Sequence, residues 1–503
     1  TDALVTWERL TADTDPEMRR RLTDARHRVL ELEERLRTEG TDPLDELSGR
    51  LNDYLGPGAE GLGMRVLASE WKERTQAAEA RASLTPILDD ARRRFRAVVE
   101  EVWGEAAEPT PLLRATDVAT VAATSGYPLI YVVPSTHGTI ALIVEPDGPV
   151  QTIEFPELDS ARLSRLLHGD DGGSPSFLRG AYYRDADALD ASLEQVVPFL
   201  NRHLLDRLDD AVERLGYRQA AIVAMGLLAL LPCHARDVGD GVAFRMVPSA
   251  RVLRIAQESR PEPPLATPRV YVLAAPEVEG QDRLGWAVIE ALAVEAQVEA
   301  RGATVSLAVG DEPARVLGQL EAANLAHLAC HANFRPSDPL ASALHVGRNA
   351  VVTLGDMAGG RRDFTGLELV VMSACRTAAI EADRPDDALG FPSQLLVAGA
   401  AGVVSTAWLV HDDTAAFFAH RFYQELADGR DPAMATQRAR AWLRSATGDD
   451  LLGVVIELME LVPAEDADAH AVLTECRRSL LTQRETRPYE HPIDWAAFAY
   501  SGV

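Results

Sequence analysis

The sequence is poor in cysteine, in basic residues and in long apolar runs. Four cysteines in 503 residues form no CxxC pair, which argues against a disulfide scaffold or a zinc ribbon and favours a reducing compartment. Acidic residues outnumber basic ones by 77 to 50, and the formal net charge is −27. Neither a nucleic-acid backbone nor an anionic membrane is therefore expected as the main partner. No apolar run reaches the roughly 18 residues that a bilayer span requires, and the N-terminus lacks a signal-peptide pattern. The sequence predicts a cytoplasmic protein.

What the chain has in quantity is material for hydrophobic cores. Hydrophobic residues make up 47% of it and charged residues 25%, which is the composition of a globular protein. A chain of this length is expected to hold roughly two to four domains. Residues 1–110 show the apolar spacing of amphipathic helices and predict a helical interaction region. Whether these helices are tetratricopeptide repeats is left open.

Strand signals begin after this helical region. Tyr127–Pro134 and Thr139–Glu145 are rich in β-branched residues and flank a turn-like segment, so they predict a hairpin. After the proline-rich linker at Pro261–Pro264, apolar strand-like runs alternate with helical ones. This alternation predicts an α/β fold with a mostly parallel sheet flanked by helices. We therefore divide the remaining chain into residues 115–262 and 265–503.

Polar residues follow two of the strands predicted in the last domain. The run Leu325–Cys330 leads into His331, and the run Leu367–Met372 leads into the segment SACRT, which contains Cys375. Because chemistry in parallel sheets lies at the carboxyl ends of the strands, a thiol and an imidazole placed there suit nucleophilic catalysis. His331 precedes Cys375 by 44 residues. Caspases have a similar arrangement, with a Q-A-C-[RQG]-G segment and a histidine about 50 residues upstream.

Several segments, in order, resemble those of CHAT domains, caspase-like cysteine proteases of clan CD that are often joined to tetratricopeptide repeats. HLACHANF is similar to the histidine segment of that family, and VVMSACRTA is similar to its cysteine segment. GFPSQLLVAGAAGVVSTAWLVHDDTA resembles the helix and strand that follow, and HPIDWAAFAYSG resembles the end of the domain. The resemblance extends from about residue 115 to the end of the chain.

This resemblance implies a role for each matching residue. Cys375 would be the nucleophile and His331 the general acid/base, while the backbone N–H groups of Ala332 and Cys375 would form the oxyanion hole. The family usually has glycine where this chain has Ala332. The resemblance also implies two caspase-like halves, which we assign as a pseudoprotease half at 115–262 and an active half at 265–503.

The residues after the strand that ends near Trp408 are expected to set substrate choice. Asp412 and Asp413 would favour a basic residue before the scissile bond, whereas Trp408 would cover an apolar one. The sequence leaves both preferences open.

The spacing of the histidines does not support a metal site. His327 and His331 have the four-residue spacing that binds zinc on a helix, but in a strand such positions lie about 13 Å apart. We expect no metal and no cofactor.

The resulting prediction is a cysteine endopeptidase of the caspase-like type that cleaves a specific protein partner. We expect the substrate to be encoded nearby and the helical N-terminal region to receive an activating protein or another conformational trigger, without nucleic-acid or membrane contact. Bacterial defence, including antiviral defence, or regulated cell death is the biological setting that the resemblance suggests. A catalytically silent, peptide-binding scaffold and a thiol-dependent acyltransferase or amidase are the alternatives. The presence of both His331 and Cys375 favours the endopeptidase over the scaffold.

Overall fold

The computed structural model describes most of the chain from residue 113 onward, and the chain divides into two compact units, residues 2–112 and 113–503. The helical region predicted at 1–110 lies largely outside the described residues, and the few that are described there are helical. The described residues are 113–503 without 170–174, 184, 237–238, 240, 261–267, 276, 280–282, 336–338, 358–361, 375–376 and 379–389, together with 20, 21, 24, 28, 87, 90, 91, 93, 94 and 98.

The first part of the larger unit is built on a five-stranded sheet with the order β3-β2-β1-β4-β5. β1 and β2 pair antiparallel, which confirms the predicted hairpin, and β1 pairs parallel with β4. The strands are β1 Leu129–Ser135, β2 Gly138–Val144, β3 Val150–Phe155, β4 Gln219–Ala224 and β5 Ala243–Met246. The helices around them are α5 Ala115–Ser125, α6 Ser160–His168, α7 Phe177–Tyr183, α8 Ala186–Leu200, η1 Asn201–Leu205, α9 Asp206–Arg214, η2 Gly226–Leu230 and α10 Ala250–Ser259.

The second part is built on an eight-stranded sheet. Five neighbouring strands, in the order β7-β6-β8-β11-β12, are parallel. β13 pairs antiparallel with β12 at one edge, and β9 pairs antiparallel with the last residues of β8. The predicted fold class, a mostly parallel sheet flanked by helices, is confirmed. The strands are β6 Arg269–Ala275, β7 Thr304–Val309, β8 Leu325–Asn333, β9 Ala343–Gly347, β10 Ala350–Thr353, β11 Leu369–Met372, β12 Gly402–Thr406 and β13 Phe498–Gly502.

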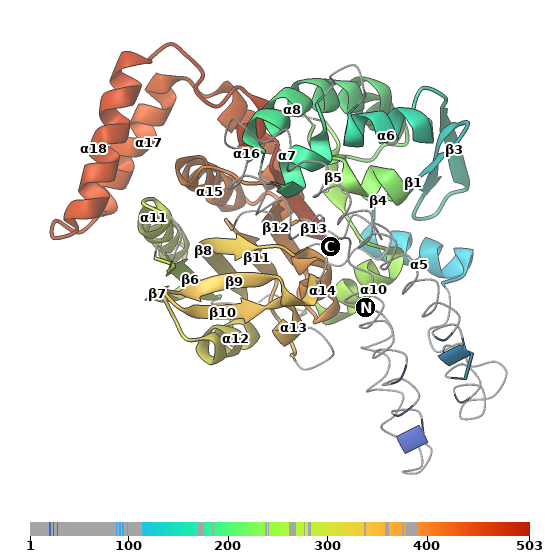
Figure 1. Cartoon of the computed structure of the whole chain (residues 1–503), viewed down its shortest axis with the longest axis horizontal. Coiled ribbons are helices and arrows are strands. Elements are labelled where there is room, and N and C mark those ends of the chain that lie inside the picture. Colours follow the sequence, from blue (N-terminus) through green and yellow to red (C-terminus); the bar gives the residue numbers. More distant parts are fainter. Residues whose placement is uncertain are drawn as a thin grey trace, which may run out of the picture. The chain divides into compact units, whose positions relative to one another are not determined.

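Helices flank this sheet, with α11 and α15 on one side and α12 and α13 on the other (Figure 1). Among the helices that the structure describes, none combines the length and the apolar character needed to cross a membrane. The helices of this part are α11 Ala287–Glu299, α12 Pro313–Ala322, η3 Pro339–Ala341, α13 Leu354–Met357, α14 Phe391–Val397, α15 Asp412–Ala427, α16 Pro432–Ser445, α17 Gly448–Leu461, α18 Ala467–Thr482 and α19 Pro492–Trp495.

Local sequence explains where several of these elements begin. Asp159, Asp185 and Asp431 each precede a helix and accept a backbone N–H from its first turn, which supplies a partner that the helix itself lacks. β11 is apolar throughout and fully buried, as expected for a central parallel strand with both faces covered.

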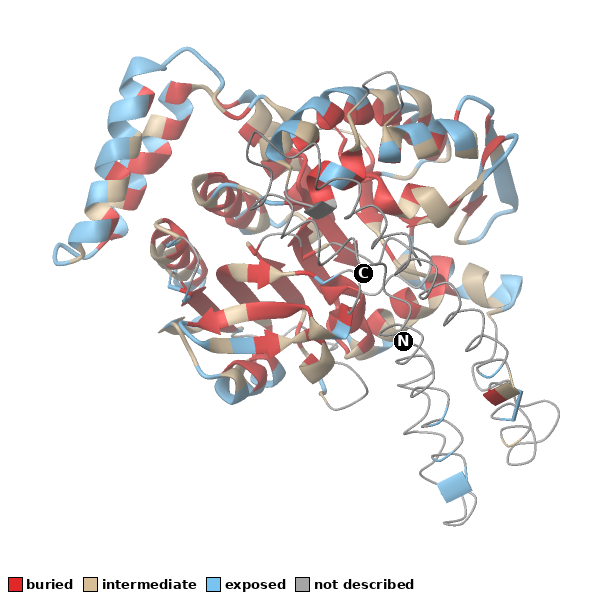
Figure 2. Cartoon of the chain, viewed as in Figure 1, coloured by how far each residue is buried: buried red, intermediate tan, exposed pale blue. Residues whose placement is uncertain are grey.

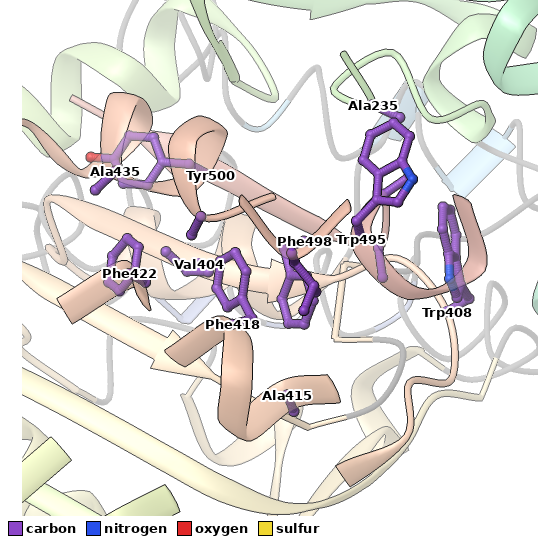
Figure 3. Packing of buried hydrophobic residues seen from close by; sticks show 14 of the residues in the cluster. Ala235, Val404, Trp408, Ala415, Phe418, Phe422, Ala435, Trp495, Phe498 and Tyr500 are labelled. Atoms are coloured by element: carbon purple, nitrogen blue, oxygen red, sulfur yellow. The ribbon is translucent and has the colours of Figure 1, made fainter. Parts of the chain in front are cut away.

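The main core surrounds the strands, which are mostly buried, while the outward faces of α17 and α18 are exposed (Figure 2). An aromatic group joins α15 to β13, where the rings of Phe418 and Phe498 stack with centroids 3.7 Å apart (Figure 3). Trp495 and Phe498 are 2% and 1% exposed and belong to the core. This packing holds α15 against the edge of the sheet that carries β12 and β13.

A buried arginine connects the two sheets. Arg245, on β5, is 2% exposed and donates hydrogen bonds to Asp431 Oδ2 at 2.8 Å and to the Tyr127 hydroxyl at 3.1 Å. Asp431 also caps α16, which belongs to the second part of the unit. Removing the arginine would leave the partly buried Asp431 carboxylate and the buried Tyr127 hydroxyl without this donor. The two parts are thus joined by an interaction that tolerates little separation.

We predict that Arg245→Met lowers the free energy of unfolding by about 3 kcal/mol, because it leaves the junction without its cation. The measurement is urea denaturation followed by tryptophan fluorescence. Arg478→Met is the matched control, since Arg478 and Glu475 form an exposed pair and such pairs contribute about 1 kcal/mol or less. Equal losses in the two variants would contradict the role of Arg245.

Candidate active site

The parallel pairing of β8 with β11 brings the two predicted segments to one edge of the sheet. Leu328 pairs with Met372, and the ladder continues as the Ser373 N–H donates to the Leu328 carbonyl at 3.1 Å. His331 follows Leu328 by three positions, and Ser373 follows Met372 directly. The histidine and the start of the cysteine segment therefore lie at neighbouring strand ends. Cys375 itself lies outside the described residues.

His331 lies inside β8 rather than after it. The prediction that the strand ends at Cys330 is wrong, because His331 and Ala332 pair antiparallel with His345 and Leu344 of β9 and extend the strand. Residues directly opposite in an antiparallel pair share a face of the sheet, so His345 lies beside His331. Burial and, second, the charge of His331 lower the pKa of His345. A second imidazole thus stands next to the predicted acid/base.

Ala332 occupies the position where the family usually has glycine. It is 6% exposed and lies within the strand. The extended backbone of a strand is open to any residue and needs no left-handed conformation. The alanine is therefore accommodated here without the strain that a positive φ would bring.

The described residues on either side of Cys375 in the sequence are bonded to each other and to the end of β12. The Ala374 carbonyl accepts hydrogen bonds from the Thr377 hydroxyl at 3.0 Å and from the Thr406 hydroxyl at 2.7 Å. The Thr406 N–H donates to the Thr377 hydroxyl at 3.1 Å, and the Ala378 N–H donates to the Thr406 carbonyl at 2.8 Å. Ala374, Thr377 and Thr406 are almost fully buried. These bonds restrict the backbone at both ends of the segment that holds the predicted nucleophile.

A buried polar network connects Ser373 to the helices that cover this face. Ser373 donates its hydroxyl hydrogen to Glu290 Oε1, and the same oxygen lies 3.0 Å from His327 Nε2. The Tyr423 hydroxyl lies 3.2 Å from His327 Nδ1. Glu290 is on α11, His327 on β8 and Tyr423 on α15. The spacing of His327 and His331 suggests only a zinc ligand, whereas the structure pairs His327 with a carboxylate and a phenol.

The three residues predicted to line a substrate pocket have intramolecular partners. Trp408 is fully buried and its indole N–H donates to the Ile493 carbonyl at 2.8 Å. Asp412 Oδ2 accepts the Trp286 N–H at 3.1 Å, and burial raises the pKa of Asp412. Asp413 Oδ2 accepts the hydroxyl of Tyr489 at 2.9 Å. Their contacts hold the start of α15 in place.

A cavity of about 300 Å³ lies beside the cysteine segment and was not predicted. Its walls come from both parts of the unit, including Ala378 and Ala407 from the second and Met225, Leu230 and Val247 from the first. Because its mainly apolar lining is distributed over the sequence from Tyr131 to Ser501, no local motif marks it. Walls of this kind suit an apolar group.

Comparison with known proteins finds a family model that matches more than half of the chain. The family model described as the CHAT domain matches residues 194–503. Two crystal structures of the Saccharomyces cerevisiae separase–securin complex have TM-scores of 0.43 and 0.45 at 9% identity and cover 77% and 87% of this chain, which spans only 30% and 34% of theirs. The crystal structure of the Arg-specific cysteine proteinase gingipain R has a TM-score of 0.33 at 8% identity, with 68% of this chain and 72% of that chain covered. Among curated proteins, none matches the sequence.

We predict that Thr406→Val lowers the free energy of unfolding by about 1–2 kcal/mol, because the isosteric side chain removes the shorter hydrogen bond to the buried Ala374 carbonyl. The measurement is thermal or urea unfolding. Thr486→Val is the control, since the Thr486 hydroxyl bonds to a carbonyl in an exposed turn and its loss should change stability by about 0.5 kcal/mol or less. A Thr406 variant as stable as the control would show that the hydrogen bond between Thr406 and the Ala374 carbonyl does not contribute to stability.

Proposed function

The chain belongs to the CHAT domain family, and from this premise we propose that it is a cysteine endopeptidase with Cys375 as nucleophile and His331 as general acid/base. The observation that carries the proposal is the register of β8 and β11. His331 follows Leu328 by the same three positions by which Cys375 follows Met372, and Leu328 and Met372 are paired. This register supports a dyad drawn from adjacent strands.

The proposed reaction is acyl transfer to a thiol followed by hydrolysis. The imidazole of His331 takes the thiol proton of Cys375, and the sulfur attacks the carbonyl carbon of the scissile peptide bond. The backbone N–H groups of Ala332 and Cys375 stabilise the resulting oxyanion. His331 then returns the proton to the leaving amine. A water molecule, deprotonated by the same imidazole, hydrolyses the thioester and releases the acid product.

We further propose that the residue before the scissile bond is apolar. Asp412 and Asp413, which would attract a basic residue, already accept hydrogen bonds from Trp286 and Tyr489. The cavity next to Ala378 is mainly apolar, which supports an apolar side chain as its occupant.

The remaining parts of the proposal concern the setting of the reaction. We propose a cytoplasmic protease that acts on a protein encoded nearby and is switched on by a partner or a conformational trigger received through residues 1–110. A role in bacterial, including antiviral, defence or in regulated cell death rests on the family resemblance alone.

The test compares wild type with Cys375→Ala and His331→Ala on neighbour-encoded proteins and on a proteome-derived peptide library, with new N-termini identified by mass spectrometry. Wild type is expected to produce cuts that cluster after apolar residues, and both variants are expected to lose at least about a thousandfold in rate, as other nucleophile and base knockouts do. Circular dichroism spectra that match wild type would show that the variants fold.

Three results would contradict the proposal in different ways. Cuts made equally by Cys375→Ala would exclude the dyad. Peptides that wild type retains without cutting would indicate the scaffold. Products that carry a transferred amine in place of a free carboxylate would indicate the acyltransferase.

A further inference from the structure

The buried Glu290 carboxylate is a feature that the proposed chemistry does not use. It is 3% exposed, on the face of α11 that packs against β8. A carboxylate loses its hydration when it is buried, and a well-packed apolar residue of similar volume is often at least as stabilising at such a position. Packing alone therefore does not explain a carboxylate here, and its partners indicate what it does.

The partners of Glu290 and His327 assign each polar atom of the network a role as hydrogen-bond donor or acceptor. Burial and the nearby Glu290 charge raise the pKa of Tyr423 well above its ordinary value, so its hydroxyl remains a donor. It donates to Nδ1 of His327, which leaves Nε2 to carry the proton and donate to Glu290 Oε1. The Ser373 hydroxyl donates to the same oxygen. Each of these three donors thus has an acceptor.

The network ends at the segment that leads to the nucleophile. Ser373 precedes Cys375 by two positions and is only half-buried, whereas Glu290 and His327 are almost fully enclosed. Its backbone N–H is bonded to Leu328 of β8 and its side chain to α11. His327 and His331 are separated by an even number of positions along β8, so they lie on the same face. The network therefore lies on the same face as the proposed acid/base.

We propose that Glu290, held by His327 and Tyr423, is a positioning residue that fixes Ser373 and thereby aligns the Cys375 segment with His331. The inference rests on the proposed function, since it concerns the same dyad. Ser373 is fixed by its side chain on this side, while Ala374 and Thr377 are fixed by β12 on the other. Glu290 is bonded to Ser373 and would act on the dyad through this serine.

The test uses the reactivity of Cys375 toward iodoacetamide, which needs no substrate. The second-order rate of alkylation is measured against pH by mass spectrometry of the peptide that contains Cys375. In wild type, transfer of the thiol proton to His331 should keep the thiol reactive below the ordinary cysteine pKa of about 8.5. His331→Ala should shift the profile to that of a free thiol.

Ser373→Ala and Glu290→Gln are each expected to lower the rate near neutral pH by roughly tenfold, equivalent to a shift of about one pH unit in the profile. The double variant should be no slower than the slower single variant, because both changes break the same interaction. Ser373→Thr, which keeps the hydroxyl, should restore most of the rate. Ser373→Ala removes only one half-buried hydroxyl and should fold even if Glu290→Gln does not.

Gln297→Leu is the matched control for a purely structural role. Gln297 also lies on α11 and bonds to His420 of α15, at 3.3 Å from both its ring Nδ1 and its carbonyl, but it does not contact Ser373. It should change thermal stability and leave the alkylation profile of Cys375 as in wild type.

The inference is overturned if Ser373→Ala reacts like wild type while His331→Ala does not, or if Gln297→Leu slows alkylation as much as Ser373→Ala. A His331→Ala profile identical to wild type would instead show that the proposed dyad fails, and the positioning role would fail with it.

Discussion

The candidate site depends on the parallel register between β8 and β11. Pairing Leu328 with Met372 places His331 and Ser373 at adjacent strand ends, and a shift of one residue would turn each side chain to the opposite face. Strong constraints surround this register. β6 pairs with β8 along most of its length, and β12 pairs with β11 from the other side. The segment that contains Cys375 in the sequence thus begins from a sheet that has little freedom to slip.

Two different kinds of interaction hold that segment at its ends. On the side of β12, threonine hydroxyls and backbone groups form a compact hydrogen-bonded clamp around the Ala374 carbonyl. On the side of α11, the link runs through a buried carboxylate and an imidazole. The first consists of neutral hydrogen bonds, whereas the second depends on a charge in the core, where such interactions are stronger and less tolerant of loss. The interactions whose loss would destabilise the protein more therefore lie on the face of the sheet where His331 lies.

The parallel core of the second sheet could be predicted from the sequence, but the antiparallel strands that extend it could not. The alternation of apolar strand-like runs with helical ones after Pro264 predicted this core, because such runs between turns are local signals. β9 was missed, and with it the extension of β8 through His331. The network could not be found, because Ser373 lies 83 positions from Glu290 and Tyr423 lies 96 from His327. No periodic pattern connects residues so far apart, and only the packing of α11 and α15 brings them together.

The central claim is that Cys375 and His331 form one dyad at the shared edge of β8 and β11. A crystal structure of the chain tests it most directly, through the distance between Sγ of Cys375 and the nearer ring nitrogen of His331. We predict a separation of about 3–4 Å, within or slightly beyond hydrogen-bond reach, with both groups on the face of the sheet that α11 covers. A Cys375 side chain on the opposite face, beyond the reach of the imidazole, would contradict the account.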